Sequence, residues 1–102
     1  MSNSDLAWVA GLFEGEGTIS TPPKSELRIK MTDLDIIQRF QTITSSNRIC
    51  TEEPRAPHHK RIWITRITGK SNCRAFLSKI LPYLGMRRAH RALDLLDFIE
   101  LR

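Results

Sequence analysis

The segment AWVAGLFEGEGTIS, residues 7–20, constrains the fold of this chain more than any other stretch. Residues 6–13 have no charged side chain, and two carboxylates, Glu14 and Glu16, then alternate with glycines. A helix that is apolar on every side must be covered on every side. The segment therefore predicts a helix that packs into a core on one side and against a second surface on the other.

Small residues recur along one face of this predicted helix, which is expected to be capped by Ser4 and to start near Asp5. Ala7, Gly11 and Gly15 are spaced four residues apart, so they share a face with almost no side chain. Small residues at this spacing let two helix backbones approach closely. Two copies of the helix paired across a two-fold axis would explain the spacing. A core helix with a close neighbour in its own chain is the alternative.

The rest of the chain alternates pairs of strand patterns with helical patterns. The expected elements after the first helix are strands 18–20 and 26–31, helix 32–44, strands 47–53 and 60–68, helix 71–81 and helix 86–102. Thr32 is expected to cap the second helix, with Asp35 in a variant of the capping box. This order predicts an α+β fold in which helices cover one face of a four-stranded antiparallel sheet, and residues 1–102 form a single domain.

Alternation in residues 26–31 gives the expected sheet a cationic face. Leu27, Ile29 and Met31 alternate with Arg28 and Lys30, so the basic pair points away from the helices, into solvent or onto a partner. Residues 60–68 leave two sets that could face outward: Arg61, Trp63 and Thr65, or Ile62, Ile64 and Arg66. The apolar face of the last helix is expected to consist of Ala89, Ala92, Leu93, Leu96 and Ile99.

Composition narrows the class of protein. Sixteen Lys and Arg against eleven Asp and Glu give a net charge of +5, which favours a nucleic acid or another anionic partner. No apolar run approaches the ~20 residues that cross a bilayer, and the N-terminus lacks the basic region of a signal peptide. Cys50, Cys73 and the three histidines do not have the spacing of a zinc site. We therefore expect a soluble, intracellular protein without a membrane partner.

The two glutamates at the end of the first helix indicate a bound cation. If two copies of the helix pair, Glu14 and Glu16 of both copies meet near the axis, and clustered carboxylates resist ionising together. A hard cation such as Mg²⁺ relieves this repulsion because it takes oxygen ligands from one or two carboxylates and from phosphate. The alternative is a pair of solvated charges, although a carboxylate at a helix C-terminus opposes the macrodipole.

The last helix has its charges in the reverse of the usual order. Arg87, Arg88, His90 and Arg91 lie in its first turns, and its acidic residues come later. Arginines at a helix N-terminus are unfavourable with the macrodipole unless an anion binds beside them. A DNA phosphate is the anion that this pattern favours, and a solvated charged face is the alternative.

These residues resemble a known family. The stretch VAGLFEGEG, residues 9–17, is similar to the LAGLIDADG motif of homing endonucleases, with glutamate at both acidic positions. MTDLDIIQRF, residues 31–40, and ITGKSNCRAFLSKILPYLGMRRAHRA, residues 67–92, resemble the short single-motif members found in phages and mobile introns. The resemblance covers essentially the whole chain. It implies the half-domain αββαββαα, whose four-stranded antiparallel sheet is saddle-shaped.

The resemblance also implies a homodimer that cuts a long, nearly palindromic site in double-stranded DNA, with Mg²⁺ or Mn²⁺ as cofactor and no small-molecule cofactor. The motif helix would form the dimer interface through Ala7, Ala10, Gly11, Glu14 and Gly15. The sheets would lie along the major groove. Such a protein would be cytoplasmic, in a bacterium or a phage-infected host cell, or organellar if an intron encodes it.

Individual roles follow from positions that match the motif. Glu16, with the adjacent Gly15, would bind the metal, and Glu14 would have a supporting role. Asp33 would order the catalytic water, and Arg87, with Arg88 as alternate, would stabilise charge in the transition state. The DNA-binding residues would be Ser20, Lys24, Arg28, Lys30, Arg48, Arg61, Arg66 and Arg88.

Two departures keep a second function open. The TPPKS turn, residues 21–25, is shorter than in many members of the family, and glutamate adds one methylene at each acidic position of the motif. The alternative is a catalytically weak or inactive DNA- or RNA-binding protein on the same fold, such as a regulator or a splicing cofactor. A structural dimer without a nucleic-acid partner is a third possibility, which the cationic strand face and the arginine-rich helix start disfavour.

Overall fold

A computed structural model of the protein describes residues 1–54 and 56–101. Their elements are α1 (Asn3–Glu16), β1 (Gly17–Ile19), β2 (Glu26–Met31), α2 (Leu34–Thr44), β3 (Cys50–Glu52), β4 (Ile62–Thr68), α3 (Lys70–Ile80), the 3₁₀ helix η1 (Leu81–Tyr83) and α4 (Met86–Glu100). The predicted α+β order is confirmed. Residue 55 of the loop between the last two strands and residue 102 of the last predicted helix lie outside the described residues.

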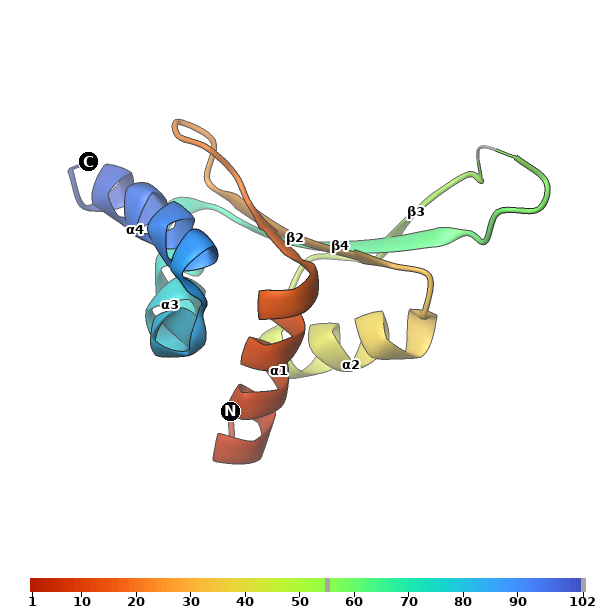
Figure 1. Ribbon diagram of the computed structural model, residues 1–102, viewed down its shortest axis with the longest axis horizontal. Helices are drawn as coiled ribbons and strands as arrows, with labels where there is room; N and C mark the ends of the chain where they lie inside the picture. Colours follow the sequence, from red (N-terminus) through yellow and green to blue (C-terminus); the bar gives the residue numbers. More distant parts are fainter. Residues whose placement is uncertain (55, 102) are drawn as a thin grey trace.

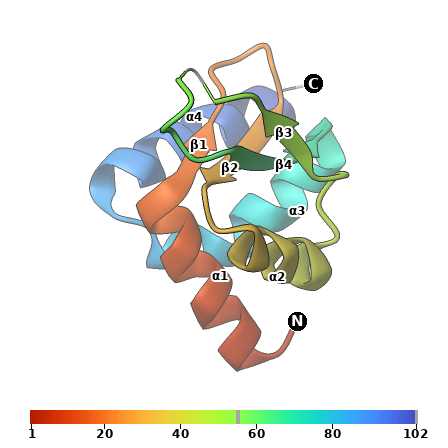
Figure 2. The ribbon, with the colours of Figure 1, turned by 90° about the vertical axis from the view of Figure 1, so that its right-hand side faces the viewer.

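The strands described here form one four-stranded sheet with the order β1-β2-β4-β3, and every neighbouring pair is antiparallel. Helices α1, α2 and α3 lie on one side of the sheet, and α4 lies beside it (Figure 1). The β1–β2 turn and the β3–β4 loop rise at opposite ends of the other face, which is concave and which we call the open face (Figure 1). Figure 2 shows the same layers after a turn of 90°.

Strand register decides which side chains belong to the open face. Arg28 of β2 is paired with Arg66 of β4, and Lys30 is paired with Ile64, so these residues share one face. Their neighbours point toward the helices and include the buried Leu27, Ile29 and Thr65. Of the two alternatives for β4, the set Ile62, Ile64 and Arg66 therefore lies on the open face, where Ile64 is nevertheless buried by its neighbours.

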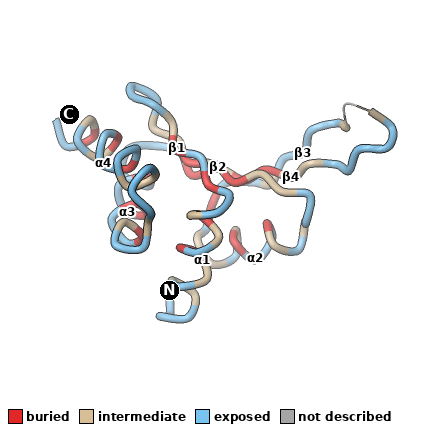
Figure 3. Tube along the Cα trace, in the orientation of Figure 1, coloured by how far each residue is buried: buried red, intermediate tan, exposed pale blue. Residues whose placement is uncertain are grey.

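The core lies between the sheet and the helices, where Figure 3 shows most of the buried residues. Phe76 of α3 makes edge-to-face contacts with Phe13 of α1 and Phe40 of α2, with ring centroids 5.4 and 5.9 Å apart. Cys73 is buried in the same cluster. Burial, with a smaller contribution from Glu26, raises the pKa of the Cys73 thiol to about 11, so the thiol stays protonated at neutral pH.

Two predicted helix caps were wrong. Ser2, and not Ser4, caps α1, because its Oγ accepts a hydrogen bond from the Asp5 N–H at 3.0 Å and the helix begins at Asn3. The N-cap of α2 is Asp33 and not Thr32, and the Asp33 side chain makes no capping hydrogen bond. The first helix also continues through Glu16, so that Gly17 is already the first residue of β1.

The predicted apolar face of α4 was wrong at one position. Leu95 is fully buried and Leu93 is exposed, since Leu95 lies three residues after the buried Ala92 and four before Ile99. Leu93 points to another side of the helix. In the part of the chain that the structure describes, no helix has the length and apolar character needed to cross a membrane.

Candidate active site and nucleic-acid interface

Glu16 and Asp33 lie in the same hollow, although 17 positions separate them in the sequence. The hollow has a volume of about 370 Å³, and Lys30 and Ile62 of the open face also line it. Glu16 is the last residue of α1, and Asp33 precedes the first turn of α2. Both residues are exposed, and within the described residues neither carboxylate forms an ion pair. The hollow therefore has two uncommitted carboxylates at the border of the open face.

These carboxylates suit a hard divalent cation in their chemistry. Mg²⁺ takes one or two carboxylates from a protein and fills its other positions with water and phosphate oxygens. In the described part of the chain, no group of three or more His, Cys, Asp and Glu side chains could hold a metal ion. One chain therefore offers a carboxylate pair, with Gly15 one position before Glu16, and not a complete cage of protein ligands.

Glu14 has entirely different surroundings from Glu16. Its carboxylate accepts a hydrogen bond from the Gly85 N–H at the start of α4 and forms an ion pair with Arg88 at 3.2 Å. Arg88 Nε donates to the Gly17 carbonyl at 3.1 Å, and the Arg88 side chain is only 19% exposed. We call this group the Glu14–Arg88 clamp. It joins the end of α1 and the start of β1 to α4.

The clamp changes how two predicted residues are used. Arg88, expected at the DNA, has its guanidinium engaged within its own chain, and Glu14, expected at the dimer interface, contacts α4. The partners lie 71 to 74 positions apart in the sequence. Only the reversed charge order of the last helix signalled that these arginines had an anionic neighbour.

Arg87 lines a different hollow from Glu16 and Asp33. It lines a second hollow of about 170 Å³ together with Arg88, Arg91 and the β1 residues Gly17, Thr18 and Ile19. The two hollows share no lining residue. The structure thus brings Glu16 and Asp33 together and places the predicted transition-state arginine beside the edge strand.

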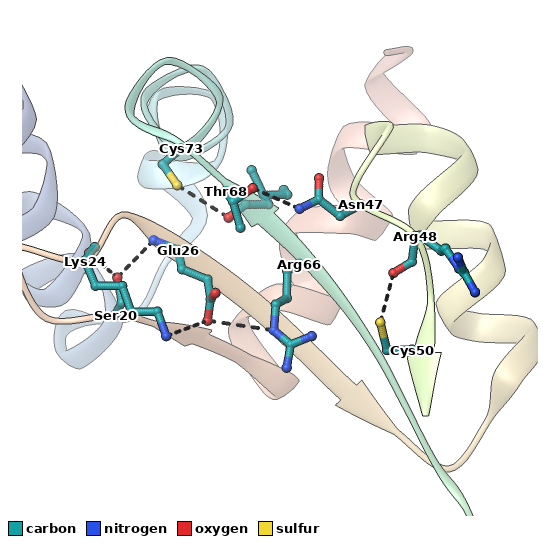
Figure 4. Close-up of polar contacts among 10 residues, drawn as sticks. Ser20, Lys24, Glu26, Asn47, Arg48, Cys50, Arg66, Thr68 and Cys73 are labelled. Atoms are coloured by element: carbon teal, nitrogen blue, oxygen red, sulfur yellow. Dashed lines mark hydrogen bonds and ion pairs between the residues drawn. The ribbon is translucent and has the colours of Figure 1, made fainter. Parts of the chain in front are cut away.

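Four predicted DNA-binding residues lie at the β1–β2 end of the open face. Glu26 lies between Lys24 at 3.5 Å and Arg66 at 3.9 Å (Figure 4). Ser20 Oγ donates to the Lys24 carbonyl and accepts from the Glu26 N–H, so this hydroxyl holds the turn (Figure 4). Arg28 faces Arg66 across the strands, and its buried Nε has no hydrogen-bond partner among the described residues. Like charges directly opposite each other on neighbouring strands are destabilising, and the Glu26 carboxylate beside Arg66 offsets part of this repulsion.

The remaining predicted cations lie toward the other end of the sheet. Lys30 pairs with Glu52 at 3.6 Å, Arg61 pairs with Glu53 at 3.3 Å, and Arg48 is exposed just before β3. Exposed ion pairs of this kind contribute about 0–1 kcal/mol each. Phosphates can therefore replace these carboxylates at little cost.

The small-residue face of α1 is uncovered in the single chain. Ala7, Gly11 and Gly15 are exposed, and apart from the adjoining backbone of α1 no described atom lies within 4 Å of the position that a Cβ would take at either glycine. Ala10, also predicted at the dimer interface, is 2% exposed and packs in the core of its own chain. The face available to a second copy is therefore the stripe formed by residues 7, 11 and 15.

Comparisons with known proteins agree with this arrangement. Residues 3–81 match the family model of the LAGLIDADG-like domain, so the chain belongs to the LAGLIDADG family. A comparison with curated protein sequences finds no significant match.

The fold is that of solved homing endonucleases. The homing endonuclease I-CvuI, in complex with the I-CreI target and 2 mM Mg, superposes with a TM-score of 0.72 at 19% identity, covering 97% of this chain and 69% of that one. The group I intron-encoded homing endonuclease I-CeuI, complexed with DNA, gives a TM-score of 0.75 at 12% identity over 98% and 56% of the two chains. The archaeal intron-encoded I-Vdi141I, also complexed with DNA, gives 0.68 at 14% identity over 96% and 66%.

Proposed function

We propose that the protein is a site-specific endonuclease of double-stranded DNA, which acts as a homodimer on a long, nearly palindromic site and depends on a divalent metal ion. The observation that carries this proposal is the hollow shared by Glu16 and Asp33, in which two uncommitted carboxylates border a concave cationic face. The DNA complexes of similarly folded homing endonucleases support the choice of partner.

Each residue near the hollow has a defined task in this proposal. Glu16 holds the metal, Mg²⁺ or Mn²⁺, which when bound supplies positive charge to the scissile phosphate and acidifies water. Asp33 accepts a hydrogen bond from the attacking water and orients it. Arg28 and Arg66 hold the backbone of the duplex on the open face, where their mutual repulsion is relieved by phosphate. Arg87, which lines the other hollow, binds phosphate from the β1 side.

The uncovered face of α1 supports the homodimer in this proposal. Small residues at positions 7, 11 and 15 allow two α1 helices to cross closely, as apolar segments without large side chains do. A two-fold axis through this contact would bring the Glu16 carboxylates of both copies toward the axis. Two such sites are what cleavage of both strands of a symmetric duplex requires.

A cleavage assay with the variant Glu16→Gln tests the proposal. The substrate is a plasmid library of long, randomised near-palindromes, incubated with Mg²⁺, with Mn²⁺ or with EDTA. We expect the wild type to cut one class of sequence in either metal and to stop in EDTA. Glu16→Gln removes a metal-binding carboxylate and should lower the rate at least about 100-fold, while binding of the same sequence in Ca²⁺ survives. Cleavage by this variant at the wild-type rate would remove Glu16 from the metal site.

A DNA- or RNA-binding protein without nuclease activity is the second candidate. It is favoured by the small number of carboxylates in the hollow and by the extra methylene of Glu16. Tight binding of one sequence class without a cut, in Mg²⁺ and in Mn²⁺, would favour this candidate. If RNA of that sequence then competes better than the duplex, the protein is an RNA-processing factor.

A further inference from the structure

Three arginines line the hollow beside β1, and its lining includes no acidic residue among those that the structure describes. Arg87, Arg88 and Arg91 come from the first two turns of α4, and Gly17, Thr18 and Ile19 form the opposite wall. Thr18 is paired with Arg28, so its hydroxyl belongs to the open face. The hollow therefore continues the open face around the edge strand of the sheet.

The three guanidiniums have unequal surroundings. Arg88 is neutralised by Glu14 and fixed by the Gly17 carbonyl. Arg87 and Arg91 are exposed, and within residues 1–54 and 56–101 neither forms an ion pair or a side-chain hydrogen bond. The Glu14–Arg88 clamp thus gives the hollow a rigid wall and leaves two guanidiniums available.

The positions of Arg87 and Arg91 are electrostatically unfavourable in the protein without a bound anion. They are four residues apart on one helix face, and like charges at this spacing destabilise a helix. Arg87 also lies in the first turn of α4, where the helix macrodipole disfavours a cation. An anion in the hollow would remove both penalties, and two arginine forks beside a hydroxyl match the oxygens of a phosphate group.

We infer that this hollow binds a backbone phosphate of a DNA duplex, outside the stretch that the open face covers, and that Arg91 is a residue of this contact. The inference rests on the proposed function in one respect, since the duplex is taken as the partner. It does not depend on cleavage. The site would add affinity without sequence preference, because a phosphate contact positions the duplex and reads no base.

The salt dependence of duplex binding tests this site. Each phosphate contact adds about 0.9 to the slope of log K against log salt concentration. We compare the wild type with Arg91→Gln and Arg91→Lys on a mixed-sequence duplex in Ca²⁺, with salt as the variable. Arg91→Gln should lower the slope by about 1 per protomer, and Arg91→Lys should keep most of it.

Arg74→Gln is the matched control. Arg74 is an exposed arginine of α3, paired with Glu100 at 3.0 Å, and α3 lies on the side of the sheet opposite the open face (Figure 1). The substitution Arg74→Gln removes the same charge as Arg91→Gln and should leave the slope of log K against log salt concentration unchanged. Thermal unfolding of each variant checks the fold, and Arg91→Gln should melt no lower than the wild type, because it relieves a like-charge pair.

The outcomes separate this site from the nuclease proposal. A slope that falls in Arg91→Gln and not in Arg74→Gln supports the phosphate site, even if the protein never cuts DNA. Equal slopes for Arg91→Gln and the wild type would overturn it, even if cleavage is found. The inference would also be overturned if Arg91→Gln weakened binding of single-stranded RNA and left binding of the duplex unchanged.

Discussion

Glu14 and Glu16 are separated by one glycine, and their carboxylates have opposite uses. The Glu14 carboxylate is paired with Arg88 and accepts a hydrogen bond from the N–H of Gly85, the N-cap of α4. Glu16 is exposed in the hollow that it shares with Asp33. The first acidic position of the motif therefore holds the fold, and the second is available for chemistry. Both residues lie in the last turn of α1, so the difference between them comes from what each side chain contacts and not from the helix backbone.

Removing the Glu14 carboxylate should lower the stability of the protein. Glu14→Ala loses a charge-assisted hydrogen bond and an ion pair, and it leaves the largely buried Arg88 with the Gly17 carbonyl alone. Because Glu14 is 37% exposed, solvent screens part of this loss, and we expect the free energy of unfolding to fall by about 1–2 kcal/mol. Urea denaturation measures the change.

The exposed pair of Arg61 and Glu53 provides the comparison. Glu53→Ala removes an ion pair of similar length, 3.3 Å, at an exposed site, and it should cost less than about 1 kcal/mol. Equal losses for Glu14→Ala and Glu53→Ala would mean that the clamp contributes no more than an ordinary surface ion pair.

At the level of single residues, the sequence predicted one group of neighbouring side chains and missed another. Glu16 and Asp33 were assigned to one site and share one hollow, although their roles there are still proposals. The partner of Glu14 was missed, because no local pattern encodes a contact between positions 71 residues apart. The transition-state role of Arg87 stays a prediction, and the structure places Arg87 in a hollow that is also lined by Gly17, the residue after Glu16.

Among the elements, α1 and β1 meet without a loop, and Gly17 is the residue that allows this. A Cβ at Gly17 would lie 2.5 Å from Cδ1 of Phe13, whose ring fills the space over the junction. The backbone angles of Gly17, φ −76° and ψ 147°, are accessible to any residue. The requirement for glycine is therefore one of space and not of backbone conformation.

Substitution of Gly17 should be costly for this steric reason. Gly17→Ala should lower the free energy of unfolding by about 1–3 kcal/mol, the usual range for overpacking a core. Gly15→Ala is the control, because its Cβ would meet no described atom within 4 Å beyond the adjoining helix backbone, and alanine favours a helix over glycine by about 0.5–1 kcal/mol. Both are measured by urea unfolding at a low, fixed protein concentration. A harmless Gly17→Ala would show that Phe13 moves aside freely.

The order of elements was predictable because each has a clear period, such as the alternation of β2 and the apolar stripe of α2. The exact ends of the elements could not be predicted. Ser2 and Ser4 are both good caps, and the choice of Ser2 lengthens α1. The orientation of β4 could not be read from its own sequence, since only pairing with β2 in the sheet decides which residues face outward.

At the scale of the whole molecule, the protein has two surfaces that a single chain leaves unfilled: the cationic open face and the small-residue stripe of α1. A chain of 102 residues buries a modest fraction of its surface, so burial against a second copy would add materially to its stability. The proposed homodimer uses the stripe and leaves the open face to DNA.

A dimer of this kind predicts a melting temperature that depends on protein concentration. Because a partner that binds only the folded state stabilises it by mass action, the wild-type melting temperature should rise as the concentration is raised. Gly11→Leu places a large side chain on the stripe, where the protomer has space for it, and should abolish the rise. Calorimetry at several concentrations, with sedimentation analysis of both proteins, measures this. A concentration-independent wild type that sediments as a monomer contradicts the homodimer.

The Glu14–Arg88 clamp also has a consequence for the timing of biosynthesis. Its two halves lie 71 or more positions apart, so a nascent chain on the ribosome exposes the finished motif helix long before residues 85–88 are synthesised. Contacts between positions so far apart form slowly, since the intervening chain must first be ordered. The clamp therefore forms only after residues 85–88 have been synthesised, and a chain interrupted before them has the motif helix without the contact that joins it to α4.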